Sequence, residues 1–162
     1  MVRYSLSLAL VVSSSLTGLA LTVGEKAPDF QLARLSDGSP VNLGGLLSAK
    51  PVAIWFCKLE PDCHKWLQVL QEAASTHEVQ LVAIPVAPNA AELAKAQKQF
   101  PQVLFLADPD GAVTLRYAGE FVAGVAPREN LYVLDLQGKL KAIRCYPGIP
   151  HRALQTLFSQ IR

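Results

Sequence analysis

The chain has 162 residues, of which 51% are hydrophobic and 17% are charged, and its formal net charge is +2. This length and composition suit one folded domain with its own core and exclude a disordered chain. Because the net charge is small and no basic run is interleaved with aromatic residues, the sequence gives no indication of nucleic-acid binding.

The N-terminal residues have the pattern of an export signal. Met1-Val-Arg3 is a short positive start, and the stretch from Leu6 to Ala20 is apolar. Gly18-Leu19-Ala20 supplies the small residues that a signal peptidase recognises. We therefore expect residues 1–20 to be a cleaved signal peptide and residues 21–162 to form the domain.

Export of this kind places the domain in the periplasm or outside the cell. An uncleaved membrane anchor is the alternative, because the uncharged stretch is almost long enough to span a bilayer. Under that alternative alone, the membrane becomes a partner of the protein.

The domain begins with a predicted hairpin and continues with alternating strands and helices. In the hairpin, residues 30–35 and 40–43 flank the turn sequence Ser36-Asp-Gly-Ser39. Apolar runs and helical spacing then predict strands over 52–56, 79–86, 103–107, 131–135 and 139–145, and helices over 62–77, 90–100 and 151–161. Residues 112–117 fit either a helical turn or a strand, and residues 119–127 are predicted to be a loop.

This order of elements defines a fold class. Strands that are separated by helices pair in parallel through right-handed crossovers, whereas the late hairpin adds antiparallel strands. The predicted fold is α/β, with a mixed central sheet, helices on both of its faces and an N-terminal β-hairpin.

Cys63 is the main candidate for chemistry. It follows the apolar strand 52–56 and opens the next helix, where unpaired N–H groups and the helix dipole favour a thiolate. Such a sulfur is suited to attack a peroxide or a disulfide. The alternative is a small apolar side chain at the start of a helix.

Two further cysteines, Cys57 and Cys145, make a total of three, which is too few for a disulfide scaffold. Cys57 is either a resolving partner for Cys63 or a buried inert thiol, and a disulfide between them requires their Cα atoms to approach within about 7 Å. Cys145, at the end of the last strand, is expected to lie in the core.

Four longer segments have a recognisable pattern. They are Val23-Gly-Glu-Lys-Ala-Pro-Asp-Phe30, Asp37-Gly-Ser-Pro-Val-Asn-Leu43, Phe105-Leu-Ala-Asp-Pro-Asp-Gly-Ala112 with Tyr117-Ala-Gly119, and Leu131-Tyr-Val-Leu-Asp-Leu-Gln-Gly-Lys139. In these segments the chain resembles the peroxiredoxin family (AhpC/TSA, bacterioferritin comigratory protein type). The resemblance covers nearly all of the chain after the predicted leader. It implies a thioredoxin-like fold and reduction of hydroperoxides with an external thiol or a thioredoxin-like reductant.

The active-site motif of that family is matched only in part. Set on this chain, Pro-x-x-x-Thr-x-x-Cys places its cysteine at Cys63, its proline at Phe56 and its threonine at Glu60. The family also brings an arginine close to the thiolate; alignment places Glu129 there, with Arg128 one residue away. The cysteine is therefore the one group of the family's set that the alignment places securely.

Each remaining candidate also has an interpretation in which it has no chemical role. Glu60 is either a general base for the thiol, which requires burial to raise its pKa, or a solvated carboxylate. Pro127 is a candidate for the cis-proline that the thioredoxin fold places opposite its nucleophile, or an ordinary trans proline. His64 is expected to be exposed and without a chemical role. The Cys57, Cys63 and His64 spacing is not a standard zinc pattern, so we expect no metal and no cofactor.

The sequence therefore predicts an exported thiol peroxidase with Cys63 as its nucleophile. A disulfide reductase that uses the same cysteine is the second possibility. A third is a binding module that has kept the fold and lost the groups that activate the thiol.

Overall fold

The computed structural model describes residues 16–161. Its main sheet has seven strands in the order β3-β2-β6-β5-β4-β8-β9. The strands are β2 (Gln31–Arg34), β3 (Pro40–Asn42), β4 (Val52–Cys57), β5 (Gln80–Pro85), β6 (Leu104–Ala107), β8 (Leu131–Leu134) and β9 (Leu140–Arg144). Strands β4, β5 and β6 run parallel, and every other neighbouring pair is antiparallel. The predicted mixed sheet and early hairpin are confirmed.

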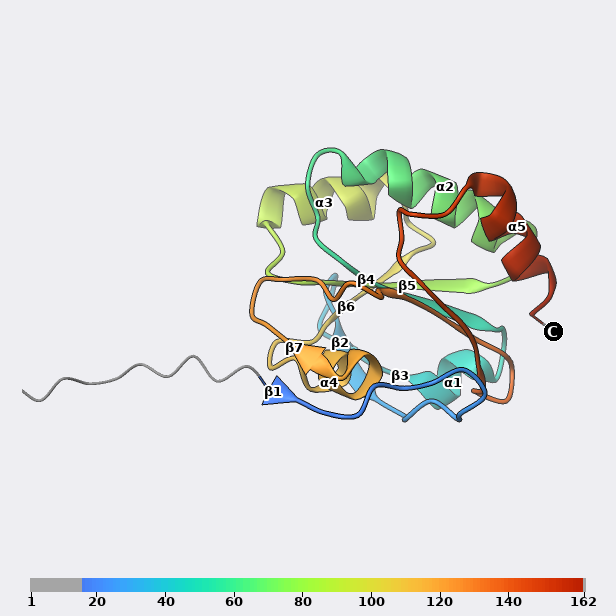
Figure 1. The fold of residues 1–162 in the computed structure, drawn as a ribbon. Coiled ribbons are helices and arrows are strands. Elements are labelled where there is room, and N and C mark those ends of the chain that lie inside the picture. The colour runs from blue at the N-terminus through green and yellow to red at the C-terminus, as the bar shows by residue number, and fades with distance from the viewer. Residues whose placement is uncertain (1–15, 162) are drawn as a thin grey trace, which may run out of the picture.

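Helices cover both faces of this sheet (Figure 1). One face carries α2 (Cys63–Thr76), α3 (Ala90–Gln99) and α5 (His151–Ser159). The other face carries α1 (Leu43–Leu47) and α4 (Ala112–Ala118). No helix within residues 16–161 has the length and apolar character needed to cross a bilayer.

Side chains of β4 divide between two cores because alternate residues of a strand point to opposite faces. Trp55 and Cys57 lie in the core beneath α2 and α5. Ile54 and Phe56 lie in the core on the α4 side, where Phe56 packs edge-on against Tyr132. All six residues of β4 are buried, as expected for a strand that is covered on both faces.

Two helices form where the sequence was ambiguous or silent. The segment 112–117 becomes α4 because the Asp108 carboxylate accepts hydrogen bonds from the N–H groups of Val113 and Thr114, which lack partners inside the helix. Gly119 then ends the helix in a left-handed conformation. The short α1 was not predicted, and the Asn42 side chain caps it by accepting from the amide of Gly45.

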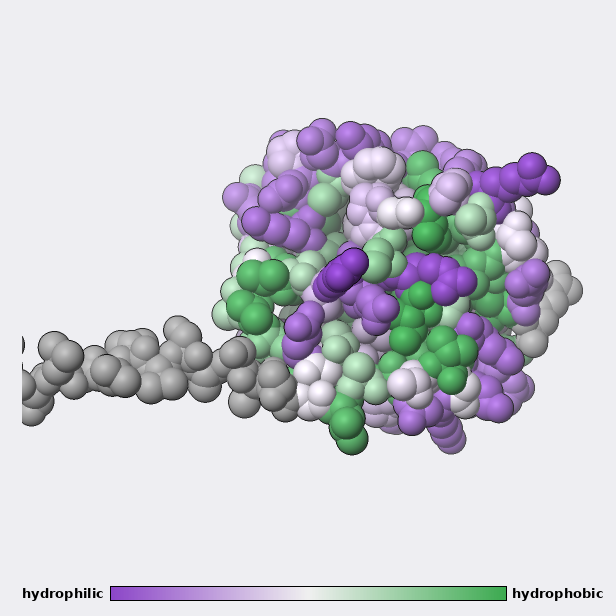
Figure 2. Space-filling view, in the orientation of Figure 1, coloured by the Kyte–Doolittle hydropathy of each residue, from purple (hydrophilic) through white to green (hydrophobic). Residues whose placement is uncertain are grey.

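A second, two-stranded sheet joins β1 (Leu16–Thr17) to β7 (Glu120–Phe121). Strand β7 lies inside the segment that the sequence predicted to be a loop. Residues 1–15 of the predicted leader lie outside the described residues, so cleavage of the leader stays a prediction. Figure 2 shows mainly hydrophilic residues along the top of the molecule, over α2 and α3, which are the solvent-facing sides of these helices.

Candidate active site

Cys57 and Cys63 lie at one edge of the sheet, at the carboxyl ends of its parallel strands. Strand β4 ends at Cys57, which pairs with Pro85 at the end of β5. The carbonyl of Cys57 accepts a hydrogen bond of 2.8 Å from the amide of Val86. A short loop of residues 58–62 then leads to Cys63, the first residue of α2. This strand–loop–helix connection therefore places both thiols at the same end of α2.

Cys63 is half-buried, and its thiol donates a hydrogen bond to the carbonyl oxygen of Lys58, with Sγ and O 2.7 Å apart. Within residues 16–161 this carbonyl is the one hydrogen-bond partner of the sulfur. A thiolate cannot donate a hydrogen bond, so this contact describes the thiol form of Cys63. The structure therefore shows a resting thiol that solvent reaches, at the start of a helix.

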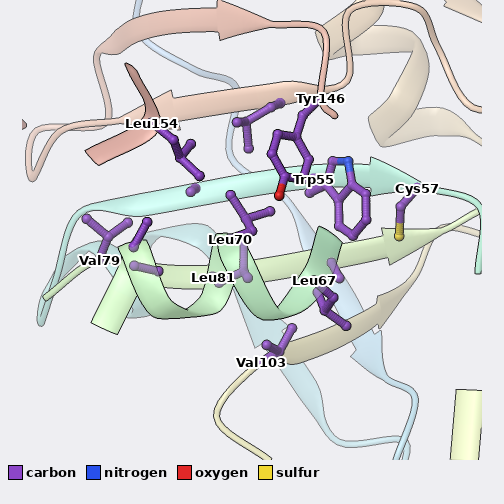
Figure 3. Packing of buried hydrophobic residues seen from close by; sticks show 14 of the residues in the cluster. Trp55, Cys57, Leu67, Leu70, Val79, Leu81, Val103, Tyr146 and Leu154 are labelled. Atoms are coloured by element: carbon purple, nitrogen blue, oxygen red, sulfur yellow. The ribbon is translucent and has the colours of Figure 1, made fainter. Parts of the chain in front are cut away.

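Cys57 differs from Cys63 in its surroundings. Its side chain is buried beside Trp55 at the end of the apolar cluster where α2 begins (Figure 3). Burial raises the pKa of the Cys57 thiol well above its usual range, and the nearby Cys63 raises it further. Cys57 is therefore a protonated thiol at neutral pH. All three cysteines are free, and the resolving role of Cys57 stays a prediction.

Glu60 does not have the burial that a general base in this position requires. Its side chain is 57% exposed and forms an ion pair with Lys58, with Oε1 and Nζ 3.2 Å apart. Its backbone carbonyl accepts a hydrogen bond from the amide of Cys63. In this arrangement Glu60 shapes the turn before α2 through its backbone, while its carboxylate faces solvent and Lys58.

Arg128 lines a surface hollow whose lining does not include Cys63. Together with Pro127 and Glu129 it lines a hollow that also contains Glu120 and Cys145. Within the described residues no hydrogen bond joins the Arg128 guanidinium to the Cys63 sulfur. The family resemblance implies a basic group beside the thiolate, and that role of Arg128 stays a prediction.

The cis-proline hypothesis for Pro127 is wrong, because the cis peptide bond of the described chain joins Tyr146 to Pro147. The reason lies in the loop before β8. The amide of Phe56 donates to the carbonyl of Asn130, so Asn130 is the residue that lies alongside the end of β4. Pro127 precedes Asn130 by three residues and lies away from that point.

The prediction of a buried Cys145 is also wrong, since this residue is exposed. The side chain of Asn130 bonds both backbone groups of Tyr146, with N–O distances of 2.7 Å. These bonds direct the Tyr146 ring into the core, where it packs edge-on against Trp55. Cys145 therefore faces the other way, toward solvent.

His64 is the functional candidate that sequence reasoning missed. We expected an exposed side chain, but only 20% of it is exposed, and it lies between α2 and α3. Its Nδ1 lies 2.8 Å from Gln99 Oε1, and its Nε2 lies 3.4 Å from Glu92 Oε2. Glu92 and Gln99 are seven residues apart, which places them on one face of a helix. This seven-residue spacing is the signal in the sequence that Glu92 and Gln99 could contact the same residue.

Within residues 16–161 no group of three or more histidine, cysteine, aspartate or glutamate side chains gathers closely enough to hold a metal ion. The ionisable groups that the structure places at this end of α2 include the two thiols and the His64–Glu92 pair.

Comparison with known proteins shows what this chain resembles. The Redoxin family model matches residues 22–151. No curated protein sequence matches. Among solved structures, the peroxidoxin BcpB from Mycobacterium tuberculosis is 20% identical, with a TM-score of 0.68 over 86% of this chain and 97% of its own.

Proteins described as acting on disulfides have similar folds. A secreted Mycobacterium tuberculosis disulfide oxidoreductase homologous to Escherichia coli DsbE is 20% identical, with a TM-score of 0.62 over 80% of this chain and 94% of its own. A thiol:disulfide interchange protein from a Bacteroides species is 15% identical, with a TM-score of 0.60 over 88% and 92%. At these identities the similarity establishes a thioredoxin-like fold.

Proposed function

Because this chain belongs to the Redoxin family, we propose that it is an exported thiol oxidoreductase in which Cys63 attacks hydroperoxides. Family membership supports thiol oxidoreductase chemistry in general. The observation that carries the proposal is the half-exposed sulfur of Cys63 at the first residue of α2, beside the carboxyl ends of the parallel strands. Ligands of open α/β sheets bind at this edge, so a substrate reaches the sulfur there.

In the proposed reaction the Cys63 thiolate attacks one oxygen of the hydroperoxide and the O–O bond breaks. The leaving alkoxide or hydroxide takes up a proton, so the peroxide is reduced and the cysteine is oxidised to a sulfenic acid. A second thiol, from Cys57 or an external molecule, then attacks the sulfenic sulfur, forms a disulfide and releases water. A thioredoxin-like dithiol reduces that disulfide by exchange.

The reactive thiolate requires a small rearrangement of the resting site. In the resting site the Cys63 thiol donates to the Lys58 carbonyl, an arrangement that suits only the protonated form. Rotation of the side chain away from this carbonyl frees the sulfur to interact with the positive end of the α2 dipole, which stabilises an anion. The exposed Lys58–Glu60 ion pair leaves the loop free to adjust.

Disulfide exchange is the second candidate, and a specific observation favours it. The threonine position of the family motif holds Glu60, whose carboxylate pairs with Lys58, and Arg128 lines a hollow that does not include Cys63. Attack on a disulfide requires a thiolate and a reachable sulfur, and not the threonine and arginine of that family. Neighbours that are described as disulfide oxidoreductases also support this candidate.

The test is to treat the reduced protein with one equivalent of hydroperoxide and to identify the oxidised residue by mass spectrometry after trapping sulfenic acid. We expect the sulfenic acid at Cys63, and Cys63→Ser should abolish turnover. Cys145→Ser is the matched control, because Cys145 is also a free thiol but lies away from the start of α2. The Cys145→Ser variant should reduce hydroperoxide at the same rate as the wild type.

The other outcomes separate the alternatives. Reduction of a protein disulfide, with a mixed disulfide trapped at Cys63 and no response to peroxide, would replace peroxidase activity with disulfide exchange. A Cys63 that responds to neither substrate would leave the binding module as the function of the domain.

A further inference from the structure

The imidazole of His64 connects the first turn of α2 to α3. It lies against Gln99 and Glu92 through its two ring nitrogens, and its ring centroid is 6.2 Å from that of Phe100. His64 immediately follows Cys63, and consecutive Cα atoms are about 3.8 Å apart. His64 is therefore the residue next to Cys63 in the first turn of α2, and its ring is held by contacts with a different helix.

Glu92 supplies the negative charge that this arrangement requires. Its side chain is 15% exposed, and its Oε2 is buried and accepts no hydrogen bond within the described residues. The pKa of Glu92 lies below its ordinary value, chiefly because Lys95 donates a hydrogen bond to it and also because of His64. The 3.4 Å separation from His64 exceeds a good hydrogen bond, so we treat this contact as an ion pair.

The hydrogen-bonding capacity of the ring agrees with this view. A neutral imidazole has one donor and one acceptor, whereas an imidazolium has two donors. An imidazolium donates from Nδ1 to Gln99 Oε1 and is at the same time attracted by the negative charge of Glu92. The neutral ring satisfies both neighbours only if the Gln99 amide is turned over.

Other charges near His64 act in both directions. Lys95 and Lys98 line the same surface hollow and oppose a second positive charge, as does the positive end of the α2 dipole. Asp62 and Lys65, on either side of the first turn, lie 3.9 Å apart and largely offset each other. Glu92 is the anion in direct contact with the ring, so its charge acts at the shortest distance.

We propose that His64, held against α3 by Glu92 and Gln99, is a positioning residue that keeps a positive charge beside Cys63 and stabilises its thiolate. The proposal deepens the proposed function, on which it rests for the role of Cys63. It assigns to His64 and Glu92 an electrostatic part like the one that the family resemblance gives to an arginine. Both the imidazolium and the N-terminus of α2 then present positive charge to the same sulfur.

The test is the rate of alkylation of Cys63 by iodoacetamide as a function of pH, in the full chain with Cys145→Ser so that the other exposed thiol does not react. His64→Gln should move the midpoint of this profile upward by about half to one pH unit. At a pH below the midpoint, this shift corresponds to alkylation that is about three- to tenfold slower. Glu92→Gln should move it in the same direction. If Glu92 acts through His64, the double variant should match His64→Gln alone.

A matched control is His77→Gln at the other end of α2, which should leave the profile unchanged. The midpoint of the His64 imidazole titration, followed by NMR, should fall in Glu92→Gln. This readout does not depend on any reaction of Cys63. The proposal would be overturned if the wild type and His64→Gln gave the same alkylation profile. It would also be overturned if the midpoint of the imidazole titration were the same in the wild type and in Glu92→Gln.

Failure of the proposed function looks different. If peroxide and disulfide substrates leave Cys63 untouched while the alkylation profile still depends on His64, the electrostatic role of His64 stands and the enzymatic role of Cys63 falls.

Discussion

The two ends of α2 carry similar histidines in different surroundings. At the N-terminal end, His64 contacts Gln99 and the carboxylate of Glu92. At the C-terminal end, His77 lies 2.8 Å from Gln155 Oε1, and the amide nitrogen of Gln155 lies 2.9 Å from a third histidine, His151. Both ends therefore have the same histidine–glutamine contact to a neighbouring helix, and only one of them has an acid.

The difference follows the direction of the helix dipole. A positive histidine is favoured at the C-terminal end of a helix and disfavoured at the N-terminal end. The helix dipole therefore favours a positive charge near His77 and opposes one near His64, and Glu92 lies beside His64 alone of the two. The proposed charge on His64 depends on Glu92 for this reason, and Cys63 is the residue that precedes it in the chain.

The largest expected effect on stability comes from weakening the packing of α2 on the sheet, which both ends of the helix share. Leu70 is fully buried in the middle of that contact (Figure 3). Leu70→Ala should lower the free energy of unfolding by about 2–5 kcal/mol, measured by urea denaturation. Gln68→Ala, on the exposed side of the same helix, should change it by less than about 0.5 kcal/mol. Equal losses in the two variants would mean that α2 is not held by its apolar face.

The second prediction concerns Cys57, the buried thiol that lies near the N-terminal end of α2. The folded-state pKa of Cys57 is raised, so its contribution to stability is complete below the unfolded pKa of about 8.5 and is lost as pH rises above that value. Stability should fall by about 1.4 kcal/mol per pH unit between pH of about 8.5 and 10. Buried tyrosines add to the loss only above about pH 10.

Urea denaturation of the wild type and Cys57→Ala across this pH range measures the effect. The alkaline loss should largely disappear in Cys57→Ala and remain in Cys145→Ala, whose thiol is exposed. An unchanged slope in Cys57→Ala would show that another group causes the alkaline loss.

The third prediction sharpens the contrast between the histidines. His77→Ala removes the hydrogen bond to Gln155 and should cost about 0.5–1.5 kcal/mol of unfolding free energy. Because Gln155→Ala removes the same bond, the double variant should lose less than the sum of the two single losses. Neither variant should move the alkylation profile of Cys63. A shift in that profile would mean that the two ends of α2 are coupled.

The smallest expected effect is on acid stability. The folded-state pKa of Glu92 is lowered, so its contribution is present above the unfolded pKa of about 4.3 and is lost as pH falls through the folded value. Stability of the wild type should therefore decline slightly more steeply below about pH 4.3 than that of Glu92→Gln. Urea midpoints at a series of acidic pH values measure the difference. A steeper decline in the variant would contradict the assigned sign.

The sequence was most informative where a pattern is repeated over several residues. The apolar run in β4 and the helical spacing in α2 identified both elements and the position of Cys63 between them, because burial on one or two faces imposes a period on the residues themselves. The short α1 and the ambiguous α4 depended instead on single side-chain caps by Asn42 and Asp108. Caps of this kind leave little trace in hydrophobic periodicity.

The position of the proposed nucleophile was predictable from the sequence, and its surroundings were not. Cys63 sits where strand and helix meet, a location fixed by local sequence. The positions of Arg128, Pro127 and Cys145 depended on the loop before β8 and on the bonds of Asn130 to Tyr146, which join residues sixteen positions apart. Local patterns do not encode which residue of a loop lies alongside a strand from another part of the chain.

The sequence by itself therefore determined the α/β order of elements, the mixed sheet and the presence of a cysteine at the start of a helix. The tertiary structure alone decided that Glu60 faces solvent, that Arg128 shares a hollow with Cys145, and that His64 and Glu92 meet across two helices. Hydrophobic burial acts on periodic patterns that can be read along the chain, whereas the charge around a sulfur is a sum over groups that only folding brings together.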